Sequence, residues 1–214
     1  MLFRSIAQYG ADAVRWFMLS DSPPERDLEW SESGIEGCWR FVQRLWRLVG
    51  QTGDTDGVNP ALDRKTHQTI AGVTADIDAL AFNKAIAKIY DLANAIEKAA
   101  PSESRNSAIR TIVLLSAPMV PHLAEQAWEK LGSEGLIANA GWPEVNPALL
   151  VESEVTIAVQ VRGKLRDTLT VAKGLTQDEL QALALASAKV QHAIDGADIR
   201  KVIVVPDRLV NIVL

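Results

Sequence analysis

The spacing of the apolar residues changes once along this chain of 214 residues. From Ala11 to Leu131 they recur at intervals of three and four, the period of a helix with one buried face. Beyond residue 152 they alternate with polar residues, the period of a strand with one buried face. The chain is therefore predicted to be mainly α: an antiparallel helical bundle followed by a small α+β domain.

The bundle is indicated by apolar stripes at 39–49, 70–77, 82–96, 109–113 and 123–131. Asn59-Pro60 pairs a capping residue with a proline in the first turn, and Gly132 follows the last stripe as a stop signal. Most of the six tryptophans stand at helical positions, so we interpret them as core anchors rather than as platforms for stacking nucleic-acid bases. The six tryptophans are Trp16, Trp30, Trp39, Trp46, Trp128 and Trp142.

The small domain is predicted in the order strand, strand, helix (or two helices), strand, strand. Val155 to Val161 alternate, Arg162-Gly163-Lys164 forms a turn, and Leu165, Leu169 and Val171 continue a second strand. Thr176 and Glu179 have the spacing of a capping box before a helix. A second hairpin spans 201–214. We expect a connecting segment at 1–30, the bundle at 31–140, a linker at 141–152 and the small domain at 153–214.

Signatures of catalysis, metal binding and membrane insertion are absent from the sequence. The three histidines lie far apart, without a second ligand at helical spacing, and there is no glycine-rich phosphate loop. Cys38, the single cysteine, is expected to be a packed thiol in a reducing, cytoplasmic protein. No apolar run reaches about 18 residues, and no secretory signal opens the chain. We therefore expect no catalytic residue and no metal site.

The net charge of −5 argues mildly against a nucleic-acid partner, but it is unevenly distributed. Residues 1–150 carry 14 basic and 19 acidic groups, whereas residues 151–214 carry 8 of each. The acidity thus belongs to the predicted bundle, and the predicted small domain is neutral.

Two basic groups are candidates for RNA contact. Arg40, Arg44 and Arg47 share one helix face and could meet consecutive phosphates, each through a bidentate contact. The alternative is a solvated face on which Glu36 pairs with Arg40 one turn away.

The second group surrounds the first hairpin turn of the small domain. Arg162 and Arg166 stand at the alternating strand positions that face away from the predicted core. A basic hairpin suits contacts to phosphates and ribose hydroxyls of folded RNA. The alternative is that charged residues protect a sheet edge from aggregation. The group consists of Arg162, Lys164 and Arg166, with Lys173, Arg200, Lys201 and Arg208 available nearby.

Several motifs resemble those of one enzyme family. Residues 9–15 (YGADAVR) and 22–30 (SPPERDLEW) are similar to the stretch after the KMSKS loop of bacterial leucyl-tRNA synthetases. Residues 121–128 (PHLAEQAW) with Gly141-Trp142-Pro143 resemble the anticodon-binding bundle of class I synthetases. Residues 159–166 (VQVRGKLR) and 205–213 (VPDRLVNIV) resemble the C-terminal domain of the leucine enzymes, whose commonest form has asparagine where Arg162 stands.

The resemblance covers Ile6 to Leu214 and leaves Met1 to Ser5 outside it, so we expect a truncated reading frame that lacks the catalytic and editing domains. It implies ATP-dependent activation of leucine and its transfer to leucine tRNA, with ATP and magnesium used by the missing catalytic domain and no cofactor in this chain. The bundle would lie along the inner side of the tRNA, and the small domain would reach its elbow. The partners implied are leucine tRNA and the other domains of the same enzyme. We expect a cytoplasmic monomer that is inactive alone.

Two other interpretations remain open. The chain could be a non-catalytic adaptor or regulatory protein whose small α+β domain binds a protein or a metabolite. It could also be the equivalent part of a valine or isoleucine synthetase, although the terminal Val-Asn-Ile-Val-Leu segment favours the leucine enzyme.

Overall fold

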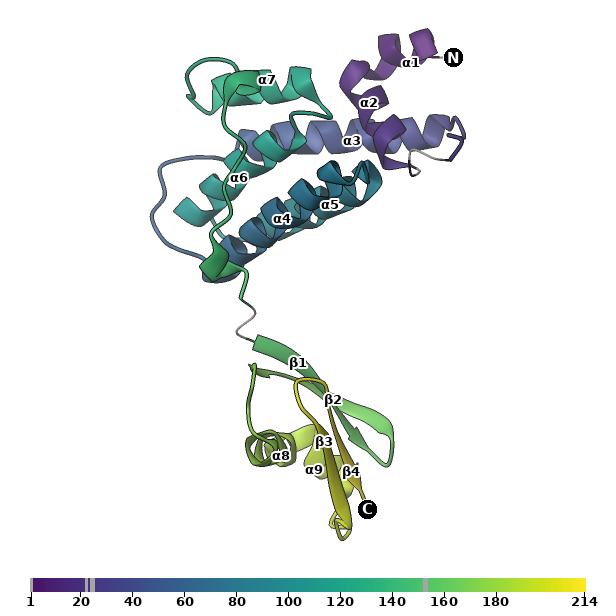
Figure 1. Ribbon diagram of the computed structural model, residues 1–214, viewed down its shortest axis with the longest axis vertical. Coiled ribbons are helices and arrows are strands. Elements are labelled where there is room, and N and C mark those ends of the chain that lie inside the picture. The colour runs from purple at the N-terminus through teal and green to yellow at the C-terminus, as the bar shows by residue number, and fades with distance from the viewer. Residues whose placement is uncertain (1, 22, 24–25, 152–153) are drawn as a thin grey trace. The chain divides into compact units, whose positions relative to one another are not determined.

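A computed structural model describes residues 2–21, 23, 26–151 and 154–214. The chain divides into two compact units, 1–150 and 151–214 (Figure 1). The division follows the change in apolar period, because each period builds a different kind of core. Ser22, Pro24 and Glu25 of the 22–30 motif lie outside the described residues, as do residues 152 and 153 at the expected linker boundary.

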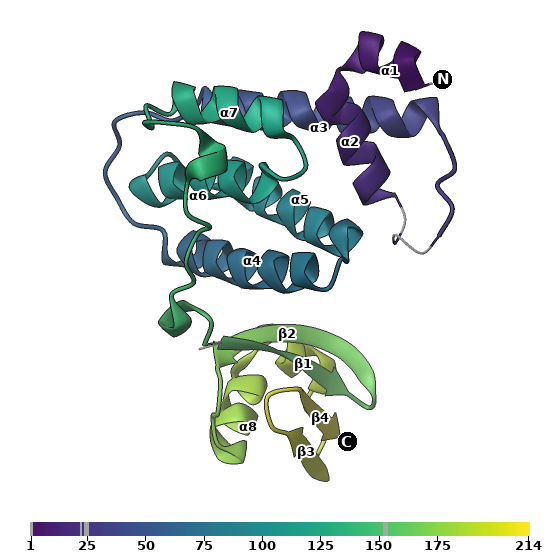
Figure 2. The same ribbon diagram turned by 45° about the horizontal axis from the view of Figure 1, so that its top comes forward.

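The first unit is helical, as predicted. Its elements are α1 (Leu2–Tyr9), α2 (Ala11–Ser20), α3 (Glu32–Val49), α4 (Pro60–Asp78), α5 (Phe82–Lys98), α6 (Glu103–Ser116), α7 (Pro121–Lys130) and two short 3-10 turns, Ile137–Asn139 and Pro147–Leu149. Figure 2 shows α4, α5 and α6 side by side, with α3 and α7 beside them. Asn59 caps α4 by accepting a hydrogen bond from the Leu62 N–H at 3.1 Å, and Pro60 occupies the first turn. Local sequence signals therefore set the start of α4.

Aromatic side chains join three helices in the core of this unit. Trp16 of α2 is fully buried, stacks on Phe41 of α3 at 5.0 Å between ring centroids, and donates its indole N–H to the Tyr90 hydroxyl of α5. Three further tryptophans are partly buried against the same core, whereas Trp39 and Trp142 are exposed. The anchoring role predicted for most tryptophans thus applies to four of the six.

Residues 141–150 lie alongside α4 in space and belong to the first unit. The Trp142 indole N–H donates to Thr74 Oγ1 at 2.8 Å, and the Asn146 backbone N–H donates to His67 Nδ1 at 3.1 Å. The sequence predicts a linker here because the apolar residues of this segment have no period. Individual hydrogen bonds to a distant helix leave no periodic trace in a sequence.

The second unit contains β1 (Glu154–Val161), β2 (Lys164–Ala172), α8 (Gln177–Ala186), α9 (Ala188–Ile194), β3 (Lys201–Val205) and β4 (Leu209–Val213). Its sheet has the order β2-β1-β4-β3, with two antiparallel hairpins joined by a parallel β1–β4 pair. Both helices pack on one face, where Ile157, Val159 and Ile212 are buried with Leu180 and Val190. The predicted α+β order and the capping box at Thr176 are both confirmed.

The first hairpin departs from simple alternation. Val159 pairs with Asp167 but Gln160 pairs with Leu165, so Arg166 is an extra residue in β2, a β-bulge. The bulge turns Leu165 to the outer face with Gln160, and Leu165 is 59% exposed. Alternation with Leu169 would have placed it on the buried face, so the parity expected at this position is wrong.

Candidate nucleic-acid interface

Arg44 of α3 is held by side chains of α5. Its Nε lies 2.7 Å from Glu97 Oε1, and its Nη2 lies 2.8 Å from both Glu97 Oε2 and Asn94 Oδ1. Only 17% of the Arg44 side chain is exposed. A planar guanidinium that bridges two helices in this way has few donors left for an external phosphate. Arg44 therefore acts as a tie between α3 and α5.

The other two arginines of this face are more available. Arg40 Nη1 lies 3.6 Å from Glu36 Oε1, and both side chains are largely exposed. Such a loose surface pair contributes little and is easily replaced by a phosphate. Arg47 is exposed, and within the described part of the chain no ion pair to it is found. The face thus presents two available guanidiniums rather than three.

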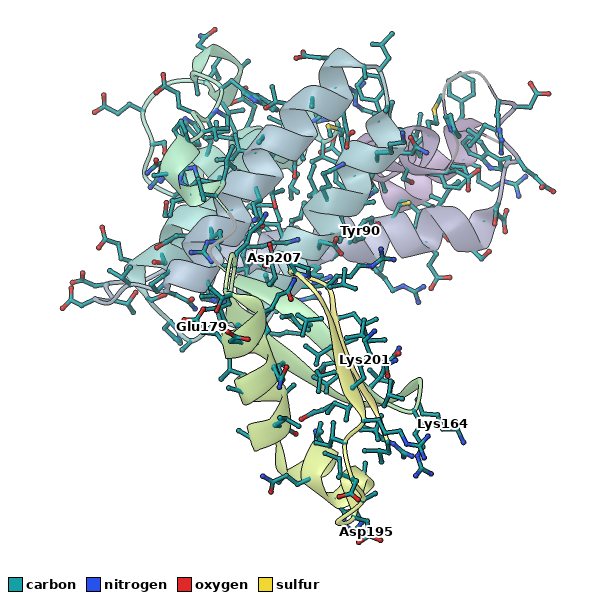
Figure 3. The ribbon with its side chains drawn as sticks, turned by 60° about the horizontal axis from the view of Figure 1, so that its bottom comes forward. Tyr90, Lys164, Glu179, Asp195, Lys201 and Asp207 are labelled. Atoms are coloured by element: carbon teal, nitrogen blue, oxygen red, sulfur yellow. The ribbon has the colours of Figure 1, made fainter. Side chains whose placement is uncertain are left out.

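Five of the seven basic residues singled out in the small domain meet at one end of its sheet. The Arg162 N–H donates to Ile212 O and the Arg200 N–H to Val213 O, both at 2.9 Å, and Lys201 pairs with Val213. The end of β1, the end of β4 and the start of β3 therefore coincide (Figure 3). We call this cluster the basic end. It consists of Arg162, Lys164, Arg166, Arg200 and Lys201, all exposed.

Lys173 and Arg208 lie elsewhere. Lys173 lies in the β2–α8 loop and Arg208 in the β3–β4 turn, and the two connections are joined by a hydrogen bond of 3.0 Å from the Gly174 N–H to Asp207 Oδ1. Figure 3 shows Asp207 at the opposite end of the unit from Lys164. The structure therefore separates this pair from the basic end.

The turn at the tip of the basic end has an unusual backbone. Arg162 and Gly163 both have left-handed φ, 52° and 75°, as in the two-residue turns typical of tight hairpins. The Gly163 N–H donates to Asn211 Oδ1 of β4 at 3.2 Å. Glycine adopts this conformation freely, but an arginine does so at a cost in backbone strain.

Asp167, next to the bulge, fastens β2 to the start of α9. Its Oδ2 accepts from the Ser187 hydroxyl at 2.6 Å, and its Oδ1 lies 2.9 Å from Lys189 Nζ. The Thr168 N–H donates to Oδ1 as well. Together these hydrogen bonds, that of Ser187 first, lower the pKa of Asp167 from 3.8 to about 2. The carboxylate is therefore ionised and paired at neutral pH.

The chemistry available at the basic end is that of cations and hydrogen-bond donors. Residues 151–214 contain no phenylalanine, tyrosine or tryptophan, so stacking of bases on aromatic rings is not available to the second unit. Asp195 lies in the segment between α9 and β3, at the end of the unit away from Asp207, and offsets part of the positive charge. The remaining excess suits the phosphates of a folded nucleic acid.

Two residues considered for other chemistry, Cys38 and His122, are engaged in structural contacts. Cys38 is buried, and burial raises the pKa of its thiol. His122 Nδ1 lies 2.8 Å from Asp12 Oδ1, and Asp12 Oδ2 also accepts the Leu123 N–H at the start of α7. Across the described ranges, no group of three or more His, Cys, Asp or Glu side chains could hold a metal ion, and no helix is long and apolar enough to cross a membrane.

Sequence reasoning missed Asn211 and Asp167 as parts of this site. Asp167 did leave a signal, because it is a charged residue at a position whose parity matches that of Leu169. A charged residue at a strand position that alternation assigns to the buried face indicates a bulge or a specific partner for the charge. Asn211 left none, since a polar residue on the outer face of a strand is ordinary.

Comparison with known proteins gives one family match. The family model described as "Anticodon-binding domain of tRNA ligase" matches residues 60–182, from α4 into α8. The match covers more than half of the chain and extends across both units.

Curated relatives are named leucine–tRNA ligase. One from Rhizorhabdus wittichii is 67% identical over 208 residues, and one from Novosphingobium aromaticivorans is 68% identical over 209 residues. Each alignment covers 97% of this chain but only 25% and 24% of the relative. The chain therefore spans about a quarter of the length of these relatives.

A solved structure is similar over the whole chain. It is the crystal structure of the ternary complex of Agrobacterium radiobacter K84 agnB2 LeuRS with tRNA and LeuAMS, which is 27% identical with a TM-score of 0.73. The similarity covers 100% of this chain and 29% of that one.

Proposed function

Because the chain belongs to the family of anticodon-binding domains of tRNA ligases, we propose that it docks tRNA for a leucine–tRNA ligase. The leucine assignment rests on relatives that are 61–68% identical and share that name. In this proposal the complete ligase joins leucine to its tRNA with ATP. The described residues of this chain contribute contacts that bind and orient the RNA.

The observation that carries the proposal is the basic end of the second unit. It gathers five cations from β2, β3 and the loops next to them in a unit without aromatic rings, which favours recognition of phosphates and ribose over stacking. We place the elbow of the tRNA there, and we place its inner side along α3, near Arg40 and Arg47. Lys173 and Arg208 would be secondary contacts at most, because they lie at the other end of the sheet.

The remaining assignments follow from the same proposal. Residues 31–140 form the RNA-facing bundle, with 1–30 connecting it to the catalytic part of the ligase, and 153–214 form the elbow-binding domain. The other partners are the catalytic and editing domains of the enzyme, which use ATP and magnesium. The protein acts in the cytoplasm as a monomer.

Binding of labelled leucine tRNA by the whole chain tests this function. Fluorescence anisotropy across a salt series should give weak binding that falls steeply with salt, because phosphate contacts release counterions. Leucine-dependent exchange between ATP and pyrophosphate should be absent. Equal or tighter binding of valine or isoleucine tRNA would contradict the leucine assignment, and no binding of any tRNA at low salt would contradict tRNA docking itself.

A further inference from the structure

We propose that Asn211 and Asp167 are positioning residues that hold Arg162, Lys164 and Arg166 as a preformed set of cations for RNA phosphates. The proposal rests on the proposed function of the basic end and adds residues that carry no positive charge themselves. It stands on two anchors, one at the turn and one at the bulge.

The first anchor holds the turn. Arg162 has a left-handed φ of 52°, a conformation that asparagine and glycine adopt readily and arginine does not. Strain of this kind persists only where the surroundings enforce it. Asn211 supplies that enforcement, because its side-chain oxygen accepts the Gly163 N–H from the neighbouring strand β4. The strained turn keeps the Arg162 charge at the tip of the hairpin.

The second anchor holds the bulge. Arg166 is the extra residue of β2, and a slip of one position would return the strand to regular pairing and change the faces of Leu165 and Arg166. Asp167 opposes such a slip, since it is bound to Ser187 and Lys189 of the α9 start. Lys189 also neutralises the carboxylate, so that Asp167 fixes the strand without cancelling the charge of its neighbour.

Preformed cations bind more tightly than mobile ones because less side-chain and loop freedom is lost on binding. Removal of either anchor should therefore weaken tRNA binding even though all basic residues remain. The two variants also separate geometry from charge. Asn211→Ala leaves the net charge unchanged, and Asp167→Asn makes the unit more positive, so electrostatics alone predicts unchanged and tighter binding respectively.

The test is anisotropy with labelled leucine tRNA and four variants of the whole chain. We expect N211A and D167N each to weaken binding about three- to tenfold. Asp195→Asn is the matched control, because it removes one carboxylate at the same end and asparagine tolerates the left-handed φ of that position. D195N should bind as tightly as the parent chain or more tightly. Binding of D167N and N211A as tight as that of the parent would overturn the inference.

The fourth variant, R162A/K164A/R166A, separates this inference from the proposed function. Weak binding by the triple variant with parental binding by N211A and D167N would leave RNA docking intact and reject positioning. Parental binding by the triple variant would reject the basic end as the RNA site and this inference with it.

Amide hydrogen exchange at Gly163 provides a readout that general destabilisation would not reproduce. N211A should accelerate exchange at Gly163 while leaving the buried amides of β1 protected. Asn211→Asp keeps an oxygen acceptor for the Gly163 N–H and should restore its protection. Equal protection of Gly163 in N211A and the parent chain would remove the first anchor from the proposal.

Discussion

Arg44 of α3 and Glu97 of α5 form a two-point ion pair, in which Nε and Nη2 donate to the two carboxylate oxygens at 2.7 and 2.8 Å. The pair explains why an arginine at the centre of a basic helix face is mostly covered. It fixes α3 against α5, so its loss should affect the stability of the bundle more than its affinity for RNA.

Arg44→Ala should destabilise the first unit by about 1 kcal/mol, the scale of a charge-assisted contact that remains partly open to solvent. Urea unfolding followed by tryptophan fluorescence measures this directly, because all six tryptophans lie in residues 1–150. Arg40→Ala is the control, since its loose pair with Glu36 should contribute less than about 0.5 kcal/mol. Equal stability of the Arg44 and Arg40 variants would show that the two-point pair contributes nothing particular.

The salt dependence of tRNA binding should report the basic end. Each phosphate contact contributes about 0.7–0.9 to the slope of log K against log salt, so R162A/K164A/R166A should reduce the slope by about 2. Lys173→Ala with Arg208→Ala removes two charges at the opposite end and should change the slope by less than about half as much. A larger slope change in the double variant than in the triple variant would place the RNA at the end of the sheet that holds Lys173 and Arg208, and would contradict RNA contact at the basic end.

Arg162→Asn should make the second unit more stable and its RNA binding weaker. Asparagine is favoured at the first position of this turn, and relief of the strain should add about 1 kcal/mol. Loss of the tip charge should weaken tRNA binding. Thermal unfolding followed by methyl NMR signals of residues 151–214 measures the first effect, and anisotropy measures the second. A variant that is less stable than the parent would contradict the strain at Arg162.

Asp167 should make the stability of the second unit depend on pH in the acid range. Its pKa is about 2 in the folded state and 3.8 without its partners, so its contribution is present above about pH 4 and is lost as the pH falls to about 2. Asp167→Asn should therefore lower stability at pH 5, and the difference from the parent should shrink toward pH 2. Methyl NMR signals during urea unfolding provide the measurement. A difference that stays constant from pH 5 to pH 2 would argue against ionisation of Asp167 as its source.

Cys38 should react slowly with thiol reagents in the folded chain. The residue is 6% exposed, and burial raises the pKa of its thiol; the hydrogen bond with Ser20 opposes this rise and the nearby Asp21 carboxylate adds to it. Labelling at pH 8 should accelerate with urea in parallel with the tryptophan signal. Labelling in native buffer at the rate of a free thiol would contradict the packing of α3 against α2.

Local patterns predicted the elements well. Asn59-Pro60 and the Thr176–Glu179 box start α4 and α8 where expected, because caps depend on a few adjacent residues. The apolar stripes identified the buried faces, as Val42 and Val49 confirm. The apolar period changes near residue 152, close to the division between the two units at 150/151.

The basic residues were harder to interpret. Their types and positions were visible in the sequence. The sequence did not show which arginines and lysines of the α3 face and of the small domain are free to contact a phosphate. Arg44 could not be separated from Arg40 and Arg47 by spacing, and Arg200 could not be assigned to the end of the sheet that holds Arg162 rather than to the end that holds Arg208.

The sequence by itself therefore determined the helices, the strands and most of the faces they bury, because these depend on period and on caps within a few residues; the exception is the bulge that turns Leu165 outward. Only the tertiary structure decided which cations are held and which are presented. Arg44 is bound by Glu97, 53 residues away, and the turn at Gly163 is held by Asn211, 48 residues away. Such contacts arise when distant elements pack together, and no local pattern records them.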